Sequence, residues 1–136
     1  MGIDFKSYSS VILMFSTNMK EIVLIEKSGK YDGIVYNDKT KITEVELSKK
    51  IKNDFDLQID PYKFRTVVTL QNIDAIRYVT IYMAVADLEK IKKDNTVLIS
   101  SIDSIPDYTI PQLKWLIPMS IDSTIYGCEC NQLLTR

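Results

Sequence analysis

The chain has 136 residues, with 17 lysines and arginines against 18 aspartates and glutamates and no histidine, so its formal net charge is -1. That length fits one domain, and a chain of this size buries roughly 68% of its unfolded surface without a disulfide or structural metal. The lack of histidine excludes Ser-His-Asp and Cys-His nucleophiles and histidine-ligated zinc, and the balanced charge argues against nonspecific nucleic-acid binding.

The first part of the chain predicts strands. Ser10 to Ser16 is a continuous apolar run, typical of a strand buried on both faces. Thr17 to Lys20 is a turn and Glu21 to Lys27 a second strand, so the two strands form a hairpin. A further turn at Ser28 to Lys30 leads into a short third strand over Tyr31 to Tyr36.

A helix follows the third strand. Thr43 is a suitable N-cap, and Glu46 three residues later completes a capping box. The predicted helix continues to about Phe55, because Leu47, Ile51 and Phe55 recur at helical spacing and form one apolar stripe.

Two long strands come next, over Phe64 to Gln71 and Ile76 to Ala86, joined through Asn72 to Asp74. Asp87 to Lys93 is a short charged helix or loop, and Thr96 to Ser100 is another strand.

The last elements are a helix and an edge strand. Pro111 suits the first turn of a helix whose apolar stripe is Leu113, Leu116 and Ile117, and Pro118 is expected to kink or end it. Thr124 to Cys130 is predicted as the edge strand. Strands, helix, strands and helix in this order predict a single α+β domain over residues 1–136, a mixed sheet with a helix on each face.

The cysteines and the apolar runs bear on localisation. Cys128 and Cys130 are too close in sequence to close a useful disulfide loop, so we expect reduced thiols and a cytoplasmic protein. Met1 to Ser9 has no signal-peptide pattern. Runs such as Val11 to Phe15 are far shorter than the ~20 residues of a membrane span, so no membrane partner is expected.

The order of elements, with a capped helix near position 45, resembles the Nudix hydrolase superfamily. Val11 to Asp38 is similar to the Nudix opening, a hairpin followed by a segment that leads into the catalytic loop. Ile110 to Asp122 is similar to the C-terminal helix of a subgroup of Nudix hydrolases, several of them phage-encoded. The resemblance implies a Nudix-like α/β/α sandwich with a mixed β-sheet between helices.

The Nudix box itself is degenerate. Its pattern is G-x5-E-x7-R-E-U-x-E-E-x-G-U, with U aliphatic, and its helical glutamates bind magnesium that clamps a diphosphate and activates water. In this chain the arginine position is Lys49, the three glutamate positions are Lys50, Asn53 and Asp54, and the helix-ending glycine is Asp56. The aliphatic positions Ile51 and Leu57 survive, whereas the loop glycines become Val35 and Tyr36.

These replacements remove the metal chemistry. An ammonium group at position 50 would repel a divalent ion by roughly several kcal/mol at an effective dielectric near ~20. Residues 37–56 contain as many lysines as acidic residues, so there is no acidic excess to offset that repulsion. We therefore expect no metal or other cofactor, and an ion pair between Lys50 and Asp54 in its place.

The resemblance then implies a catalytically degenerate domain that binds a nucleotide-type ligand or a protein partner, and a phage protein of this kind would modulate a host factor in the host cytoplasm. The expected ligand-binding residues are Lys50, Asp54, Tyr78, Tyr82 and Trp115. Lysine would contact phosphate, Trp115 would stack on a base, and the tyrosines would floor the pocket. Each has a purely structural alternative: a solvated helix face for Lys49, Lys50 and Lys52, a core anchor for Trp115, and ordinary sheet packing for the tyrosines.

Two other functions stay open. An active Nudix-type pyrophosphohydrolase with a non-standard magnesium site would have to recruit Asp38, Glu44, Glu46, Asp54 or Asp56. Asp94 would serve as its base, although Asp94 to Thr96 is equally a turn before a strand. A structural interaction module would use the C-terminal edge strand or the tyrosine-bearing sheet face. Cys128 and Cys130 form only a weak metal motif, and a homodimer is left open because Nudix-like domains often dimerise.

Overall fold

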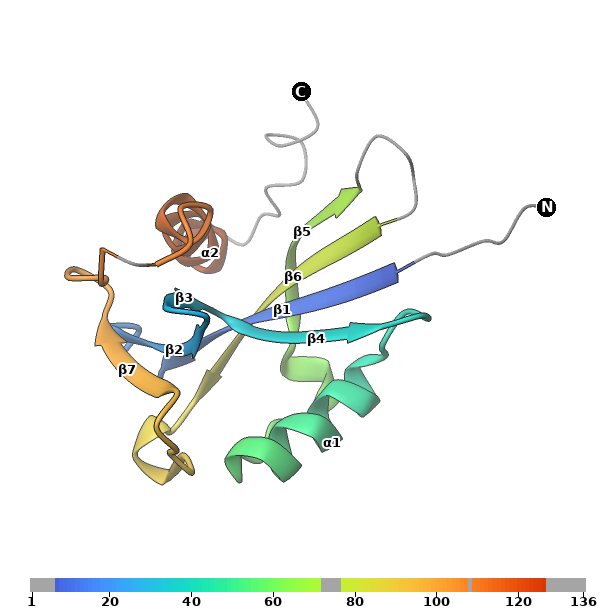
Figure 1. Cartoon of the computed structure of the whole chain (residues 1–136), viewed down its shortest axis with the longest axis horizontal. Helices are drawn as coiled ribbons and strands as arrows, with labels where there is room; N and C mark the ends of the chain where they lie inside the picture. Colours follow the sequence, from blue (N-terminus) through green and yellow to red (C-terminus); the bar gives the residue numbers. More distant parts are fainter. Residues whose placement is uncertain (1–6, 72–76, 108, 127–136) are drawn as a thin grey trace.

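The computed structural model describes residues 7–71, 77–107 and 109–126, which form a mixed β-sheet with a helix on each face (Figure 1). The strands are β1 (Ser7–Ser16), β2 (Glu21–Lys27), β3 (Lys30–Asp32), β4 (Ile34–Asp38), β5 (Arg65–Gln71), β6 (Arg77–Ala86) and β7 (Val97–Ser101). The helices are α1 (Glu44–Phe55) and α2 (Leu113–Tyr126), and the 3-10 turns are η1 (Pro61–Lys63) and η2 (Leu88–Lys90). The predicted α+β class is confirmed.

Strand β1 is the centre of the sheet. It pairs in parallel with β6 from Ser7–Arg77 to Ser16–Ala86, and β6 in turn pairs antiparallel with β5. On its other edge, β1 pairs with β4 along its first half and with β2 only at Phe15. Strand β2 then leaves β1 and pairs with β3 and β7, so the sheet order is β3-β2-β1-β6-β5 with β4 beside β1.

Gly33 divides the predicted third strand into two. The residues before it pair with β2 as β3, and those after it pair with β1 as β4. A Cβ at Gly33 would lie 3.1 Å from the Ile12 carbonyl oxygen and 3.1 Å from Val11 Cγ1. Glycine therefore allows the chain to pass close against β1 where it changes partner.

Side chains of β1 point alternately to the two faces of the sheet and contribute to two hydrophobic cores. Ile12 and Met14 point toward α1, whose predicted stripe is buried there as Leu47, Ile51 and Phe55. Val11, Leu13 and Phe15 point toward α2, which buries Leu113, Leu116 and Ile117. The predicted stripes of both helices and the two-sided burial of β1 are thus confirmed, and the two helices cover opposite faces (Figure 1).

Helix α1 has the predicted start. The Glu46 amide donates to Thr43 Oγ1 at 3.2 Å, and the Thr43 amide donates back to the Glu46 carboxylate, so the capping box is formed. The helix ends at Asp56, whose φ of 56° lies in the left-handed region that favours glycine. Asp56 occupies the position where the Nudix resemblance places a glycine, and it accepts a hydrogen bond from Lys52 at 2.8 Å.

Helix α2 corrects one prediction and narrows another. Thr124 to Tyr126 are helical where an edge strand was predicted, and of the two outcomes expected for Pro118, a kink or an end, the helix does not end there. Burial of Leu116 and Ile117 against the sheet favours continuation of the helix, which offsets the hydrogen bond that proline cannot donate. The rest of the predicted strand, with Cys128 and Cys130, lies outside the described residues. Within the described part of the chain, no helix is long and apolar enough to cross a membrane.

Candidate functional site

Three tyrosines lie on the side of the sheet that faces α1. Tyr8 on β1 pairs with Tyr78 on β6, and Tyr36 on β4 pairs with Ser10, two residues along from Tyr8. Side chains two residues apart share a face, and Ile12 from the same series of β1 is in the core under α1. We call Tyr8, Tyr36 and Tyr78, each half-buried, the tyrosine surface.

Tyr36 joins this surface to α1. Its hydroxyl donates a hydrogen bond to Asp54 Oδ2 at 2.7 Å, and the Lys50 ammonium lies 5.6 Å from the centre of its ring. Burial raises the pKa of Tyr36 above its usual range, and the hydrogen bond to Asp54 and the charge of Asp54 raise it further. The predicted Lys50–Asp54 ion pair is wrong, because Tyr36 stands between them: it takes the carboxylate as an acceptor and the ammonium as a cation–π partner.

Both oxygens of Asp54 are engaged. Oδ2 accepts from Tyr36, and Oδ1 accepts from the Asn53 side-chain amide at 3.2 Å. Asp54 is the sole carboxylate among the three positions that the resemblance assigns to metal-binding glutamates. Over the residues that the structure describes, no group of three or more His, Cys, Asp or Glu side chains is placed to hold a metal ion.

The rings of Tyr8 and Tyr78 are stacked on one another. Their centroids are 5.0 Å apart with an interplanar angle of 13°, and the Gln71 side-chain amide donates to the Tyr78 hydroxyl at 3.5 Å. Standard sheet spacing places Tyr78 two strands, about 10 Å, across from Tyr36 and two residues, about 7 Å, along the strand. The stacked pair is thus a flat aromatic element on the same face as Lys50 and Tyr36.

Tyr82 does not share this surface. Its side chain is only 1% exposed, and its ring packs edge-on against Phe64 in the core under α1. Its hydroxyl donates to the Glu44 carboxylate at 3.3 Å, and burial together with Glu44 raises the pKa of Tyr82 to about 12. Of the two tyrosines predicted to floor a pocket, Tyr78 lies on the tyrosine surface, whereas Tyr82 is a core residue.

Trp115 and the lysines on either side of Lys50 in α1 lie elsewhere than the tyrosine surface. Trp115 is 39% exposed on α2, the helix on the opposite face of the sheet, so it cannot stack on a ligand held by Lys50. Lys49 and Lys52 line a shallow hollow of about 330 Å³ with Asn53. Lys52 pairs with Asp56, as a residue of a solvated helix face would.

Asp94 was predicted either as a catalytic base or as part of a turn before a strand, and the structure places it in such a turn. Its carboxylate accepts from the amide and the hydroxyl of Thr96, and the hydrogen bonds from Thr96 lower the pKa of Asp94. An Asx turn just before β7 accounts for these contacts.

Sequence reasoning missed Tyr8 and Tyr36 as site residues. Tyr36 stood at a lost loop glycine, and Tyr8 preceded the predicted first strand. The alternation Tyr8, Ser10, Ile12 in β1 and Ile34, Tyr36 in β4 carries the signal, because it predicts which side chains share a face. The strand pairing that brings them together required the structure.

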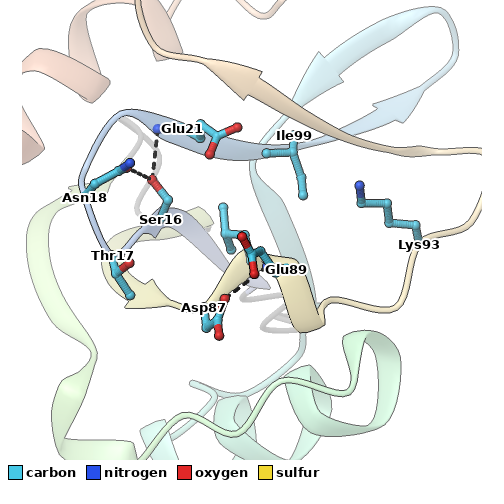
Figure 2. A pocket seen from close by; sticks show the side chains of 9 residues that line it. Ser16, Thr17, Asn18, Glu21, Asp87, Glu89, Lys93 and Ile99 are labelled. Atoms are coloured by element: carbon cyan, nitrogen blue, oxygen red, sulfur yellow. Dashed lines mark hydrogen bonds between the residues drawn. The ribbon is translucent and has the colours of Figure 1, made fainter.

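A separate hollow of about 420 Å³ lies where β1 ends (Figure 2). Figure 2 shows Glu21 and Ile99 along one side and Asp87 and Glu89, from the η2 turn, opposite them. Lys93 stands near Ile99, and the hydroxyl of Ser16 donates to the Asn18 side chain at 2.6 Å. This hollow combines three carboxylates with one ammonium. Its lining residues come from segments that are far apart in the sequence, so the sequence alone does not predict it.

No protein-family model matches the chain, and no curated protein matches it in sequence.

Proposed function

We propose that this chain is a non-hydrolytic, Nudix-like binding domain that holds a nucleotide-type ligand on the tyrosine surface, with its phosphates at Lys50. The observation that carries the proposal is the Tyr36 contact, which occupies Asp54 at 2.7 Å and leaves the Lys50 ammonium over the ring. An exposed ammonium attracts phosphate. The neighbouring carboxylate of Asp54 already accepts a hydrogen bond from Tyr36, so it is a poor ligand for magnesium.

The aromatic pair supplies the second half of the recognition. A base has a flat apolar face, and stacking on an aromatic side chain contributes roughly 1–3 kcal/mol per base. The rings of Tyr8 and Tyr78 are half-buried, and standard sheet spacing places Tyr8 one strand and Tyr78 two strands, about 10 Å, across from Tyr36. A ligand with one aromatic group and one phosphate group separated by a sugar spans such a distance.

Active hydrolysis would need a different arrangement. Asp54 would have to leave the Tyr36 hydroxyl, and a second carboxylate would have to approach it past Lys50. Glu44 and Glu46 lie at the other end of α1, where Glu44 accepts from Tyr82 and Glu46 belongs to the capping box. These contacts favour a structural use of both glutamates.

The test is a thermal-shift panel of nucleoside mono-, di- and triphosphates, each with EDTA and with magnesium. A ligand at one hundred times its Kd stabilises a fold by about 2.7 kcal/mol, which is readily measured. We expect one nucleotide class to stabilise the chain in EDTA, and Lys50→Gln to abolish the shift. Lys49→Gln is the matched control, since its side chain lies on the same helix and lines a different hollow.

Two results would contradict the proposal. The first is magnesium-dependent release of phosphate or nucleoside monophosphate that is lost on Asp54→Ala, because it would show an active metal site. The second is a nucleotide shift that is the same in Lys50→Gln as in the wild type, because it would place the ligand elsewhere.

A further inference from the structure

Two hollows meet at the end of the sheet far from the tyrosine surface. Tyr8 and Tyr78 are the second residues of β1 and β6, whereas Ser16 and Ala86 are paired at the last residues of these strands. Thr17, directly after β1, lines both hollows. Whatever binds at this end leaves the proposed ligand surface open.

One hollow is acidic. Glu21, Asp87 and Glu89 face it, with Lys93 as its single ammonium (Figure 2). Asp87 is 4.0 Å from the Lys90 ammonium, while Glu21 and Glu89 form no ion pair with any residue in the described ranges. The η2 turn that carries Asp87 and Glu89 is held by backbone hydrogen bonds from Lys90 to Asp87 and from Ile91 to Leu88. The hollow thus presents excess negative charge on a defined backbone.

The other hollow is basic and apolar. It has a volume of about 460 Å³, and its lining residues are Thr17, Tyr62, Lys63, Arg65, Met83, Ala84 and Val85. Tyr62 is 79% exposed and Val85 39%, and both stand beside the cationic side chains. Tyr62 and Lys63 project from η1, whose backbone is closed by the hydrogen bond from Lys63 N to Asp60 O at 2.9 Å. Tyrosine is one of the residue types enriched among the side chains that dominate binding at protein interfaces, and the hydroxyl of Tyr62 donates to the Asp60 carboxylate at 3.3 Å.

We propose that a second copy of this chain docks at this end, with Tyr62 and Lys63 of each copy entering the acidic hollow of the other. A two-fold symmetric interface uses the same surface on both copies, so each surface must be complementary to itself. Two hollows of opposite charge that share Thr17 satisfy that condition. With a two-fold axis near Thr17, the acidic hollow of each copy would face the basic hollow of the other, so the same contact would form twice. Charge complementarity of this kind sets the orientation of partners.

The charges argue for a second copy over an unrelated partner. A purely acidic partner would fit the η1 side and be repelled by Glu21 and Glu89, and a purely basic partner would meet the opposite conflict at Lys63. The chain itself carries both halves of the complement at one end. Its formal net charge of -1 also keeps long-range repulsion between two copies small.

Sedimentation equilibrium on the full chain tests the dimer. At about 0.1 mM protein, where mass action favours association, we expect a dimer in low salt. Raising the ionic strength from about 0.05 M to about 0.5 M should weaken the association at least roughly tenfold, because salt screens the exposed charges. A chain that is monomeric in low salt at this concentration would overturn the proposal.

Charge reversal identifies the surface. Glu89→Lys and Lys63→Glu should each be monomeric on their own, while an equimolar mixture of the two variants should form a heterodimer, since every reversed charge then meets an opposite one. Lys41→Glu, an exposed reversal in the loop before α1, should dimerise as the wild type does. Tyr62→Ala, at a side chain that is 79% exposed, should weaken the dimer without unfolding the chain. A mixture that stays monomeric, a Tyr62→Ala variant that dimerises as the wild type does, or a Lys41→Glu variant that dissociates would overturn the proposal.

Discussion

Replacing Tyr36 with phenylalanine removes one oxygen atom and keeps the ring over which Lys50 lies. The lost contact is the 2.7 Å hydrogen bond from the hydroxyl to Asp54. Hydrogen bonds to charged groups contribute roughly 1.5–3 kcal/mol, but the exposed carboxylate of Asp54 is screened by solvent, which reduces the expected loss to about 0.5–1 kcal/mol. For a chain of this length that loss lowers the unfolding temperature by about 2–4 °C.

The same variant should change the alkaline limb of the stability curve. The pKa of Tyr36 is raised in the folded chain above its ordinary value of 10.0, so the native state keeps a proton that the unfolded chain releases as pH rises past that value. Its contribution to stability is therefore complete below about pH 10 and is lost above it. Tyr36→Phe should show a shallower loss of stability above pH 10 than the wild type does.

Thermal unfolding of the two proteins followed by circular dichroism from pH 7 to pH 11 makes the comparison. All other side chains are the same in both proteins, so the difference between the curves isolates Tyr36. Equal unfolding temperatures at pH 7 and equal alkaline slopes would refute the reasoning, because they would mean that the hydroxyl makes no hydrogen bond to Asp54 in solution.

Two further substitutions test the parts of the fold that position the site. Gly33→Ala should cost about 1–3 kcal/mol, since the new Cβ would lie 3.1 Å from the Ile12 carbonyl oxygen, which cannot move away without disturbing β1; urea unfolding measures it, and a midpoint equal to the wild type's would contradict the close approach. Thr43→Ala removes the capping box of α1 and should cost about 1 kcal/mol in the same assay, whereas Thr43→Ser should retain most of it. An alanine variant as stable as the serine variant would show that the cap contributes nothing.

Local patterns predicted the elements that local energetics decide. Strand β2 has the predicted bounds, Glu21–Lys27, and α1 starts at its predicted cap, because apolar spacing and capping chemistry depend on neighbours in sequence. The split of the third strand at Gly33 depends on the separation of β1 from β2, which no local window contains. Likewise, Pro118 predicts a kink or an end of the helix locally, and burial against the sheet favours continuation of the helix beyond it.

The candidate site could be predicted only in part for the same reason. Tyr78 and Tyr82 share one face of β6, yet Tyr78 is half-buried in the stack with Tyr8 while Tyr82 lies under α1 against Phe64. Their common periodicity cannot distinguish the two positions, since it gives the face and not the depth. Lys50 and Asp54 were expected to meet one another, and the ring between them came from a strand whose pairing was not predictable.

The most direct test of the proposed binding surface is isothermal titration calorimetry in EDTA. A nucleoside triphosphate is titrated into the wild-type chain and, for comparison, into Lys50→Gln. Metal-free binding by the wild type, weakened at least roughly tenfold in Lys50→Gln and little changed in Lys49→Gln, is the predicted result, because a hydrogen bond to a charged group contributes roughly 1.5–3 kcal/mol and about 1.4 kcal/mol is tenfold in affinity. Binding that requires magnesium and survives Lys50→Gln would contradict the proposed role of this surface.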